Sequence, residues 1–454
     1  ALSERRVTSS VVALGGAAFA VNAALCVIDM GARAEDTDGN RDTLLNGAQD
    51  EFASDLKAEE PGLTEEERQN TAGGLMVFAG VDDSRASVAS ERQSISLNGP
   101  ASSDSVSVRL GRDVRLETRG NMTLRAGAST SVTQTTGGLS AAIFGGSTSG
   151  VGVSTLSTSV GIDLGTNARL RADGDIALSA FNGAITGENL LTATGYTLTA
   201  SAGYAVGVGI ATTTVTGTSG LTLGAGAGLG GYLGRRANDV SLSATRGGLV
   251  SVDVTNASLS LAGGAGLVVS SANLSGGTNI DIGDTRINAE DVIVEADDTS
   301  RVTAEGEGSS GGIGGGLNSV IVTATADATG TLVADGAEIE AGSVRIANES
   351  AVSAQARARG IAAGGLAIGA SVATSDMRVT LDSQVDANIR AADILVVTQL
   401  RGDAFDTSAA FSTSASGGIL AGNGAVSSAW TNHAIAARIG GRLEASNETR
   451  IVTG

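Results

Sequence analysis

The feature that most constrains the fold is a degenerate repeat of about fifty residues that recurs along most of the 454-residue chain. Most copies carry an apolar residue, an alanine two residues later, and then a short run in which apolar and polar residues alternate. Copies begin, at intervals of 54, 65, 52, 52, 50 and 54 residues, at Leu116, Leu170, Arg235, Ile287, Ile339, Ile389 and Leu443. A period of this length predicts structural units that stack and share a buried surface.

The copy from Thr331 to Asp376 predicts β-strands. Its first part alternates between apolar and polar residues, namely Val352, Ala354, Ala356 and Ala358 against Ser353, Gln355, Arg357 and Arg359. This period of two predicts a strand with one buried and one solvated face. The following stretch, Leu366 to Thr374, carries small residues on both faces, so we expect neighbouring copies to approach it closely.

The composition supports the same fold class. The chain has 66 glycines, 2 prolines and 2% aromatic residues, so its core must consist of small side chains in regular layers. We therefore expect an all-β, repetitive parallel β-solenoid (β-helix) over residues 73–454, with about 50–54 residues per unit. Because fifty residues exceed one typical coil, each unit is expected to make about two turns, or one turn plus a hairpin. We place an extra loop at Gly217 to Gly231 to explain the longest interval.

Residues 1–33 are predicted to be a partial first repeat, the first β arm of the array. The apolar stretch from Val11 to Met30 superficially matches a signal peptide or a membrane span. However, it shares a Gly-Gly start, alternating small apolar residues and an Asp-Met end with the arm from Gly365 to Met377. We therefore interpret it as a buried strand, predict no membrane span, and interpret a chain that begins at Ala1 as a fragment.

Residues 34–72 have a different chemistry and predict a small helical insertion. An apolar stripe with a period of four is typical of an amphipathic helix and comprises Leu44, Ala48, Phe52 and Leu56. Thr64 and Glu67 form a capping box for a second short helix. We expect this insertion to cap or decorate the array.

Four residues of the insertion, Asp36, Asp38, Asn40 and Asp42, have the spacing of a calcium-binding loop around a glycine. In such loops, carboxylates and a backbone carbonyl surround a hard cation at a tight turn. Two further carboxylates are missing from the expected pattern, so the alternative is a solvated acidic turn that caps a helix. Calcium is the one cofactor candidate that the sequence offers.

Arg401, Gly402 and Asp403 form the integrin-type tripeptide at a predicted turn and are the candidate interaction residues. Three common residues carry little information in a chain rich in glycine and aspartate. The GxGxxG match at Gly226 to Gly231 lacks the flanking strand and helix of a dinucleotide-binding loop, so we discount it. His433 is the only histidine, and its neighbours indicate a turn.

The densest acidic stretch of the array runs from Asp281 to Asp298. Polysaccharide lyases and hydrolases with a β-helix fold need clustered carboxylates in a groove lined with aromatic residues. Here the carboxylates alternate with apolar residues, which places them at solvated strand positions, and sugar-binding aromatic residues are nearly absent. We therefore predict no catalytic residues and no enzymatic activity.

The net charge of −19 at pH 7 bounds the partners. An acidic surface repels nucleic acid, which excludes that class of partner, and it keeps a strand-rich protein soluble. Such a surface can also collect divalent cations. Cys26 is the only cysteine, so no disulfide forms within the chain.

The segments GGLAIGASVATSDM (Gly364 to Met377) and GGAAFAVNAALCVIDM (Gly15 to Met30), followed by strands with alanines at fixed positions, resemble repeats of very large bacterial surface exoproteins. The nearest group is the leukotoxin-family filamentous adhesins, with their filamentous-haemagglutinin-like relatives. This resemblance implies secretion to the cell exterior, an extended β-solenoid, and a role in adhesion, filament formation or surface architecture. It also implies self-association and binding to host or surface polysaccharide or protein. The alternatives are a β-helix enzyme that degrades polysaccharides and a toxin or host-cell-binding module.

Overall fold

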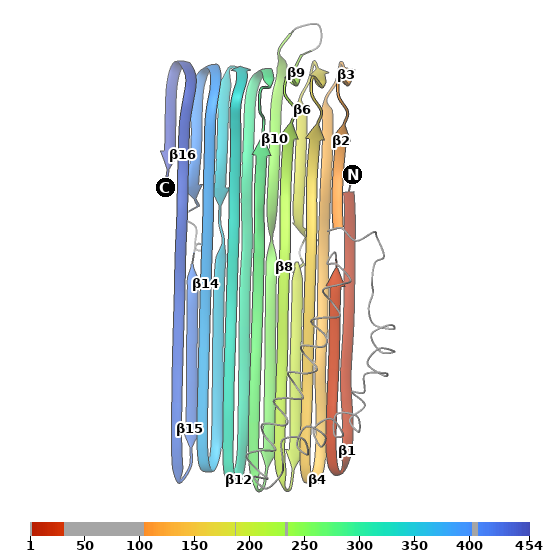
Figure 1. The fold of residues 1–454 in the computed structure, drawn as a ribbon, viewed down its shortest axis with the longest axis vertical. Helices are drawn as coiled ribbons and strands as arrows, with labels where there is room; N and C mark the ends of the chain where they lie inside the picture. Colours follow the sequence, from red (N-terminus) through yellow and green to blue (C-terminus); the bar gives the residue numbers. More distant parts are fainter. Residues whose placement is uncertain (1, 31–103, 187, 232–234, 402–406) are drawn as a thin grey trace, which may run out of the picture.

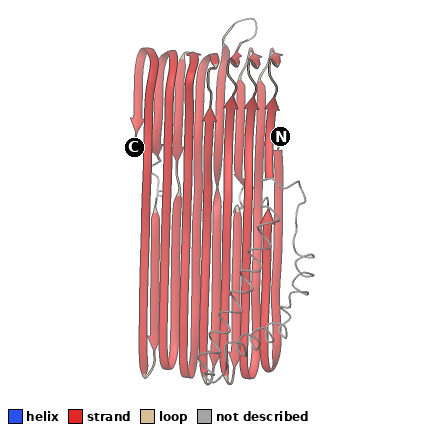
Figure 2. Cartoon of the chain, in the orientation of Figure 1, coloured by secondary structure: helices blue, strands red, loops and turns tan. Residues whose placement is uncertain are grey.

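The chain folds as stacked β-strands. The computed structural model describes residues 2–30, 104–186, 188–231, 235–401 and 407–454, and every regular element within these ranges is a β-strand (Figure 2). All the strand pairings in the described part are parallel. The expected all-β, parallel solenoid is therefore confirmed. The predicted helices and the calcium candidates Asp36, Asp38, Asn40 and Asp42 lie outside the described residues.

From β2 onward, the strands follow one another along the chain with short connections between them. Their bounds are β1 Leu2–Met30, β2 Asp104–Leu110, β3 Arg115–Thr118, β4 Met122–Leu164, β5 Arg169–Ala172, β6 Ile176–Ala184, β7 Leu191–Ser201, β8 Tyr204–Leu223, β9 Gly228–Gly230, β10 Ala237–Ser260, β11 Gly263–Asp281, β12 Arg286–Glu340, β13 Ser343–Ser350, β14 Ser353–Leu400, β15 Ser408–Gly417 and β16 Leu420–Thr453. The longest strands continue around a turn and therefore contribute two arms each.

Each coil consists of two long arms that run in opposite directions (Figure 1). A descending arm runs from the upper to the lower end of Figure 1, and an ascending arm returns. Descending arms pair only with descending arms of neighbouring coils, as in Val240↔Val292, and ascending arms pair with ascending arms, as in Val268↔Val320. We call the two layers the descending sheet and the ascending sheet.

One repeat unit makes one coil, so the expectation of two turns, or of one turn plus a hairpin, is wrong. Arg301 pairs with Ser353, which is one unit later, and no residue of the described part pairs with a residue half a unit away. The reason is the length of the arms, since each arm of more than twenty residues uses up half of the repeat. The long axis of the described part consequently lies along the strands and not along the stack (Figure 1).

The extra loop predicted at Gly217 to Gly231 is also wrong. Residues 217–223 continue strand β8 and pair with β11, and Leu229 pairs with both Leu170 and Ile287. The additional residues lie at two other places, between Ala184 and Leu191 and between Gly230 and Ala237, where the register to neighbouring coils shifts. Hence the copy assigned to Arg235 begins at Leu229.

The interior between the two sheets contains two apolar clusters at different heights. The upper cluster includes Leu170, Ile287 and Ile339, and the lower cluster includes Val252, Val302 and Val352. Val352, Ala354, Ala356 and Ala358 are all buried, which confirms the alternation read from the sequence. Burial of about 25 cal/mol per Å² of apolar surface makes these layers the main stabilising term.

Small residues face inward at the lower end, where glycines cluster at the turns. In β14, Ala367, Gly369 and Ala373 point toward the interior, whereas Leu366 and Ile368 point outward and are 45% and 46% exposed. The close approach expected for this stretch therefore comes from the opposite sheet, and it leaves the large side chains outside. At the lower end, small residues thus fill the interior and large apolar side chains lie on the outer surface, which is the reverse of the usual arrangement.

The upper turns reuse one backbone conformation. Asp113 and Asn167 both have φ of 58°, and Gly226 has φ of 73° at the corresponding place in the next coil. Asn, Asp and Gly tolerate this left-handed region better than other residues. The Nδ2 of Asn167 donates to Oδ1 of Asp113 at 3.0 Å, so the turn side chains also pair along the stack.

The long connection near the N-terminus joins the array inside an ascending arm. Met30 pairs with Leu156 and Asp104 pairs with Thr158, so the end of β1 and the start of β2 lie beside positions of β4 that are separated by the single residue Ser157. Val11 to Met30 belongs to β1, as predicted, but the expectation that this stretch is buried is wrong for its outward residues, since Leu14 and Phe19 are each 71% exposed. Within the described ranges, no helix has the length and apolarity required to span a bilayer.

Packing at the lower end yields a direct test. Gly308 faces inward, and a Cβ there would lie 2.6 Å from Oδ1 of Asn318 and 2.9 Å from Val320. We predict that Gly308→Val lowers the free energy of unfolding by about 1–3 kcal/mol because the sheets cannot move apart without cost. Gly311→Val, on the outer side of the same strand with its nearest contact at 3.7 Å, is the matched control. Urea titration followed by circular dichroism measures both, and equal midpoints for the two variants would contradict the close approach of the sheets.

Candidate interaction surface

The outer side of the ascending sheet carries apolar residues in register on seven neighbouring strands. One row runs straight across the stack and consists of Leu25, Val151, Ile210, Val269, Ile321, Val372 and Val426. Ile321 is 41% exposed and Val426, on the edge strand, is 57% exposed. The row arises because every coil places an aliphatic residue at the same outward position.

Three further rows lie between this row and the lower turns. They include Phe19, Tyr204, Leu366 and Leu420 next to the turns, then Val21, Val206, Leu317 and Ile368, then Val208 and Leu267, with Gly, Ala and Ser at the other positions. We call these four rows of the ascending sheet the apolar face. None of its residues is charged.

Several ion pairs lie at the opposite end of the molecule, near the upper turns. Arg286 pairs with Glu338 at 2.7 Å and Arg390 with Glu444 at 2.8 Å, each pair bridging two neighbouring coils near the upper turns. On the ascending sheet, the residues that follow the apolar face are mostly Thr and Ser, and charge returns with Asp327 and Asp376. Along the ascending sheet, the outward residues thus change from apolar near the lower turns to charged nearer the upper turns.

Buried asparagines complete the interior beneath the apolar face. The side chain of Asn256 donates to the carbonyl oxygen of Gly207 at 2.5 Å, and that of Asn318 donates to Gly308 at 2.7 Å. A Cβ on Gly207 would lie 2.4 Å from Oδ1 of Asn256, so glycine opposite asparagine is a steric requirement. These hydrogen bonds satisfy the amide NH2 groups of both side chains, which would otherwise be costly to bury.

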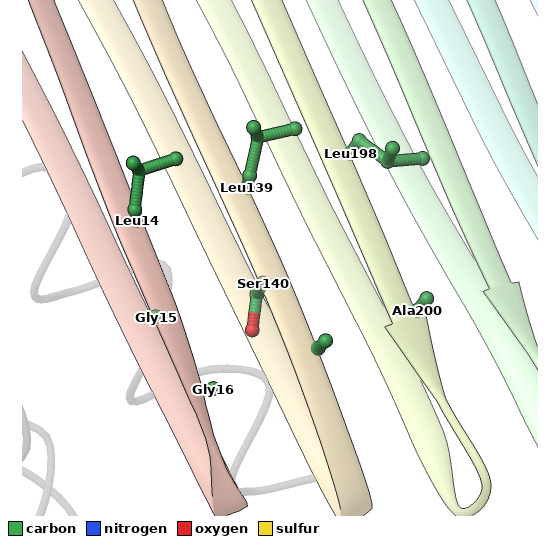
Figure 3. A pocket seen from close by; sticks show the side chains of 8 residues that line it. Leu14, Gly15, Gly16, Leu139, Ser140, Leu198 and Ala200 are labelled. Atoms are coloured by element: carbon green, nitrogen blue, oxygen red, sulfur yellow. The ribbon is translucent and has the colours of Figure 1, made fainter.

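The descending sheet has a smaller apolar trough at the same end (Figure 3). Leu14, Leu139 and Leu198 stand on successive strands above Gly16 and Ala200, around a space of about 550 Å³. Ligand sites of that size combine an apolar lining with several convergent polar groups. The only polar side chain here, Ser140, donates to the carbonyl oxygen of Ala20 at 3.4 Å. The trough therefore has the chemistry of a contact surface and not of a catalytic pocket.

A buried ion pair lies between the two apolar clusters. The guanidinium of Arg246 contacts Oδ2 of Asp298 through Nε at 2.9 Å and through Nη2 at 2.7 Å, and both side chains are at most 4% exposed. Ser300 donates to the other carboxylate oxygen at 2.5 Å. Since Arg246 and Asp298 are register partners on neighbouring coils, this pair ties one coil to the next.

Arg246 contacts two glycines of the opposite sheet, and one of them, Gly276, makes room for it. Its Nη1 donates to the carbonyl oxygen of Gly217 at 3.2 Å, and a Cβ on Gly276 would lie 2.7 Å from that nitrogen. Gly276 also has φ of 126°, which residues other than glycine rarely adopt. The arginine thus bridges the two sheets, and glycine is needed at position 276.

The acidic stretch is used in contacts between coils. Asp291 accepts a hydrogen bond from Ser343 at 2.5 Å, and Asp297 pairs with Arg401. Burial raises the pKa of Asp297, and the hydrogen bond and charge of Arg401 oppose that rise. The prediction that these carboxylates occupy solvated positions is wrong for Asp298, which is buried.

Arg401, the first residue of the integrin-type tripeptide, is held against the array. Besides its pair with Asp297, its Nε lies 3.7 Å from Oε2 of Glu349, and its side chain is 32% exposed. Gly402 and Asp403 lie outside the described residues. Within the ranges that the structure describes, no group of three or more His, Cys, Asp or Glu residues is arranged to hold a metal ion.

Sequence reasoning missed both the apolar face and the buried ion pair, although the alternation of inward and outward residues along the strands could have identified them. Val292, Val294 and Ala296 face inward, and Asp298 and Val302 continue the same parity. Likewise, Ile368 shares the outward parity of Val372. Following one parity through each strand, and not residue type alone, identifies both features.

Comparison of the chain with protein-family models, with curated proteins and with solved structures gave no match. The family resemblance inferred from the repeats therefore stays a prediction.

The buried pair generates a second prediction. Asp298→Ala is expected to lower the free energy of unfolding by about 3–5 kcal/mol because it leaves the Arg246 charge buried and unpaired. Replacing both partners, Arg246→Met with Asp298→Leu, is expected to restore most of that loss. Glu338→Ala, which breaks the exposed pair with Arg286, is the control and should cost less than about 1 kcal/mol. A double variant as unstable as Asp298→Ala, measured by urea titration, would show that the pair is not the cause.

Proposed function

We propose that this chain is a non-enzymatic structural segment of a large secreted or cell-surface bacterial protein, in which stacked coils form a stiff scaffold for adhesion or surface architecture. The observation that carries the proposal is the use of polar side chains in joining coils. Asp291, Asp298 and Glu305 each contact a residue one coil away, so these carboxylates are engaged in contacts between coils. An active site needs carboxylates free to meet a substrate.

The shape of the coil indicates how such a scaffold grows. Each additional coil lengthens the stack by about 4.8 Å and covers the edge of the coil before it. Because the arms are long, every coil contributes a broad, hydrogen-bonded layer, which gives stiffness perpendicular to the strands. Surface polysaccharide or protein is the partner class that suits an acidic, flat exterior of this kind.

Single-molecule force spectroscopy tests the scaffold. Pulling on the two ends of the chain is expected to peel coils one at a time, with steps of about 52 residues, or roughly 18 nm of contour length. Slightly larger steps are expected for the two coils with additional residues, between Ala184 and Leu191 and between Gly230 and Ala237, and the largest step where a coil contains residues 31–103. A single cooperative rupture would contradict an array of stacked coils.

Enzymatic activity is tested separately. We expect no release of products when the chain is incubated with acidic polysaccharides such as pectate, alginate and hyaluronate. Turnover that disappears in Asp291→Asn or Asp297→Asn would replace the structural function with that of a polysaccharide-degrading enzyme.

A further inference from the structure

We propose that the apolar face of the ascending sheet is the surface through which two copies of this chain pair face to face. The inference rests on the proposed scaffold function and deepens it, because it names the partner of one surface of the scaffold as a second copy. The argument uses the size of the face, its lack of charge, and the charges around it.

The size of the face matches a stable interface. Seven strands at a spacing of about 4.8 Å and four rows at a spacing of about 6.8 Å cover roughly 900 Å². A standard protein interface buries about 800 Å² on each partner, whereas the largest apolar patch of a typical monomer measures about 300–600 Å². The face is therefore large enough for a dimer and larger than a monomer normally exposes.

The lack of charge explains how two acidic chains can meet here. With a net charge of −19, two copies repel one another over most of their surfaces. Pairing through the apolar face removes Ile321, Leu317 and Ile368 from water, while the ion pairs at the upper end stay solvated. Two sheets that pack in this way lie about 10 Å apart, with side chains of both faces in contact.

The surrounding charges disfavour a lipid surface as the occupant. Proteins that insert an apolar face into a bilayer usually flank it with Lys and Arg, which bind anionic headgroups. The nearest charges on the ascending sheet are Asp327 and Asp376, and Arg378 is bound to Asp376 at 2.7 Å. This border is acidic, so it repels an anionic membrane.

The trough on the descending sheet is a weaker candidate for the same role. The row of the trough leucines continues across the descending sheet to Ser309 and Ile361. One row above these residues lie Glu307 and Arg359, and two rows above lie Glu305 and Arg357. The pKa of Asp253, beside Glu305, is raised by burial and by the neighbouring carboxylates. Charge thus lies within a few residues of the trough, whereas four complete rows of the ascending sheet are free of it.

Sedimentation velocity of the whole chain, at micromolar concentrations and physiological salt, tests the proposal. The wild-type chain is expected to sediment as a dimer. Ile321→Glu, in the row of the apolar face that crosses all seven strands, is expected to weaken the dimer about 100-fold or more, because each copy would bury an unpaired carboxylate. Thr329→Glu, on the same strand and also exposed but outside the face, adds the same charge and should leave the dimer unchanged.

Three outcomes overturn the proposal. A wild-type chain that is monomeric throughout shows that the face is not a self-association surface, whether residues 31–103 or another partner cover it. Equal weakening by the two substitutions shows a general charge effect. Flotation of the wild-type chain with neutral phosphatidylcholine vesicles, lost in Ile321→Glu, identifies lipid as the occupant. If the chain is monomeric in sedimentation but unfolds in steps of one coil in force spectroscopy, the proposed scaffold function stands and only the pairing of two copies is rejected.

Discussion

The structure depends on parallel, in-register pairing between residues one repeat apart. No coil has a core of its own in the usual sense, because the two sheets of a single coil would be two isolated strands. Hydrogen bonds to the coils on either side make each arm part of a sheet, and apolar layers such as that of Val250, Val302 and Ala354 then become continuous along the stack. A shift by one residue would move every inward side chain to the outer face.

This pairing explains why the same residue types recur at the same height. The left-handed turn positions of Asp113 and Asn167 stack, and so do the partners Arg246 and Asp298. The buried charges of Arg246 and Asp298 are paired between neighbouring coils, and a slipped register would leave them unpaired. The apolar face arises in the same way, because an aliphatic residue repeated once per coil becomes a row when the coils stack.

The repeat and its alternation were enough to predict the fold class and the strands around Val352 and Ala354. The number of turns per unit was not predictable in this way, since the period gives the length of a coil but not the length of its arms. The insertions next to Leu191 and Ala237 were missed because glycine-rich stretches match several registers equally well. The sequence also hid the apolar face, because Leu366 and Ile368 suggest a core until the opposite sheet shows that only small side chains fit inside.

The most direct test of in-register stacking is the distance between side chains one coil apart. In a chain with Cys26→Ala, nitroxide labels on cysteines at positions 303 and 355, which are register partners, should lie within about 10 Å and broaden the continuous-wave electron paramagnetic resonance spectrum strongly. Labels at positions 303 and 361 are three rows out of register, roughly 20 Å apart, and should show no such broadening. A narrow spectrum for the first pair, or equal spectra for the two pairs, would contradict the stacked-coil structure.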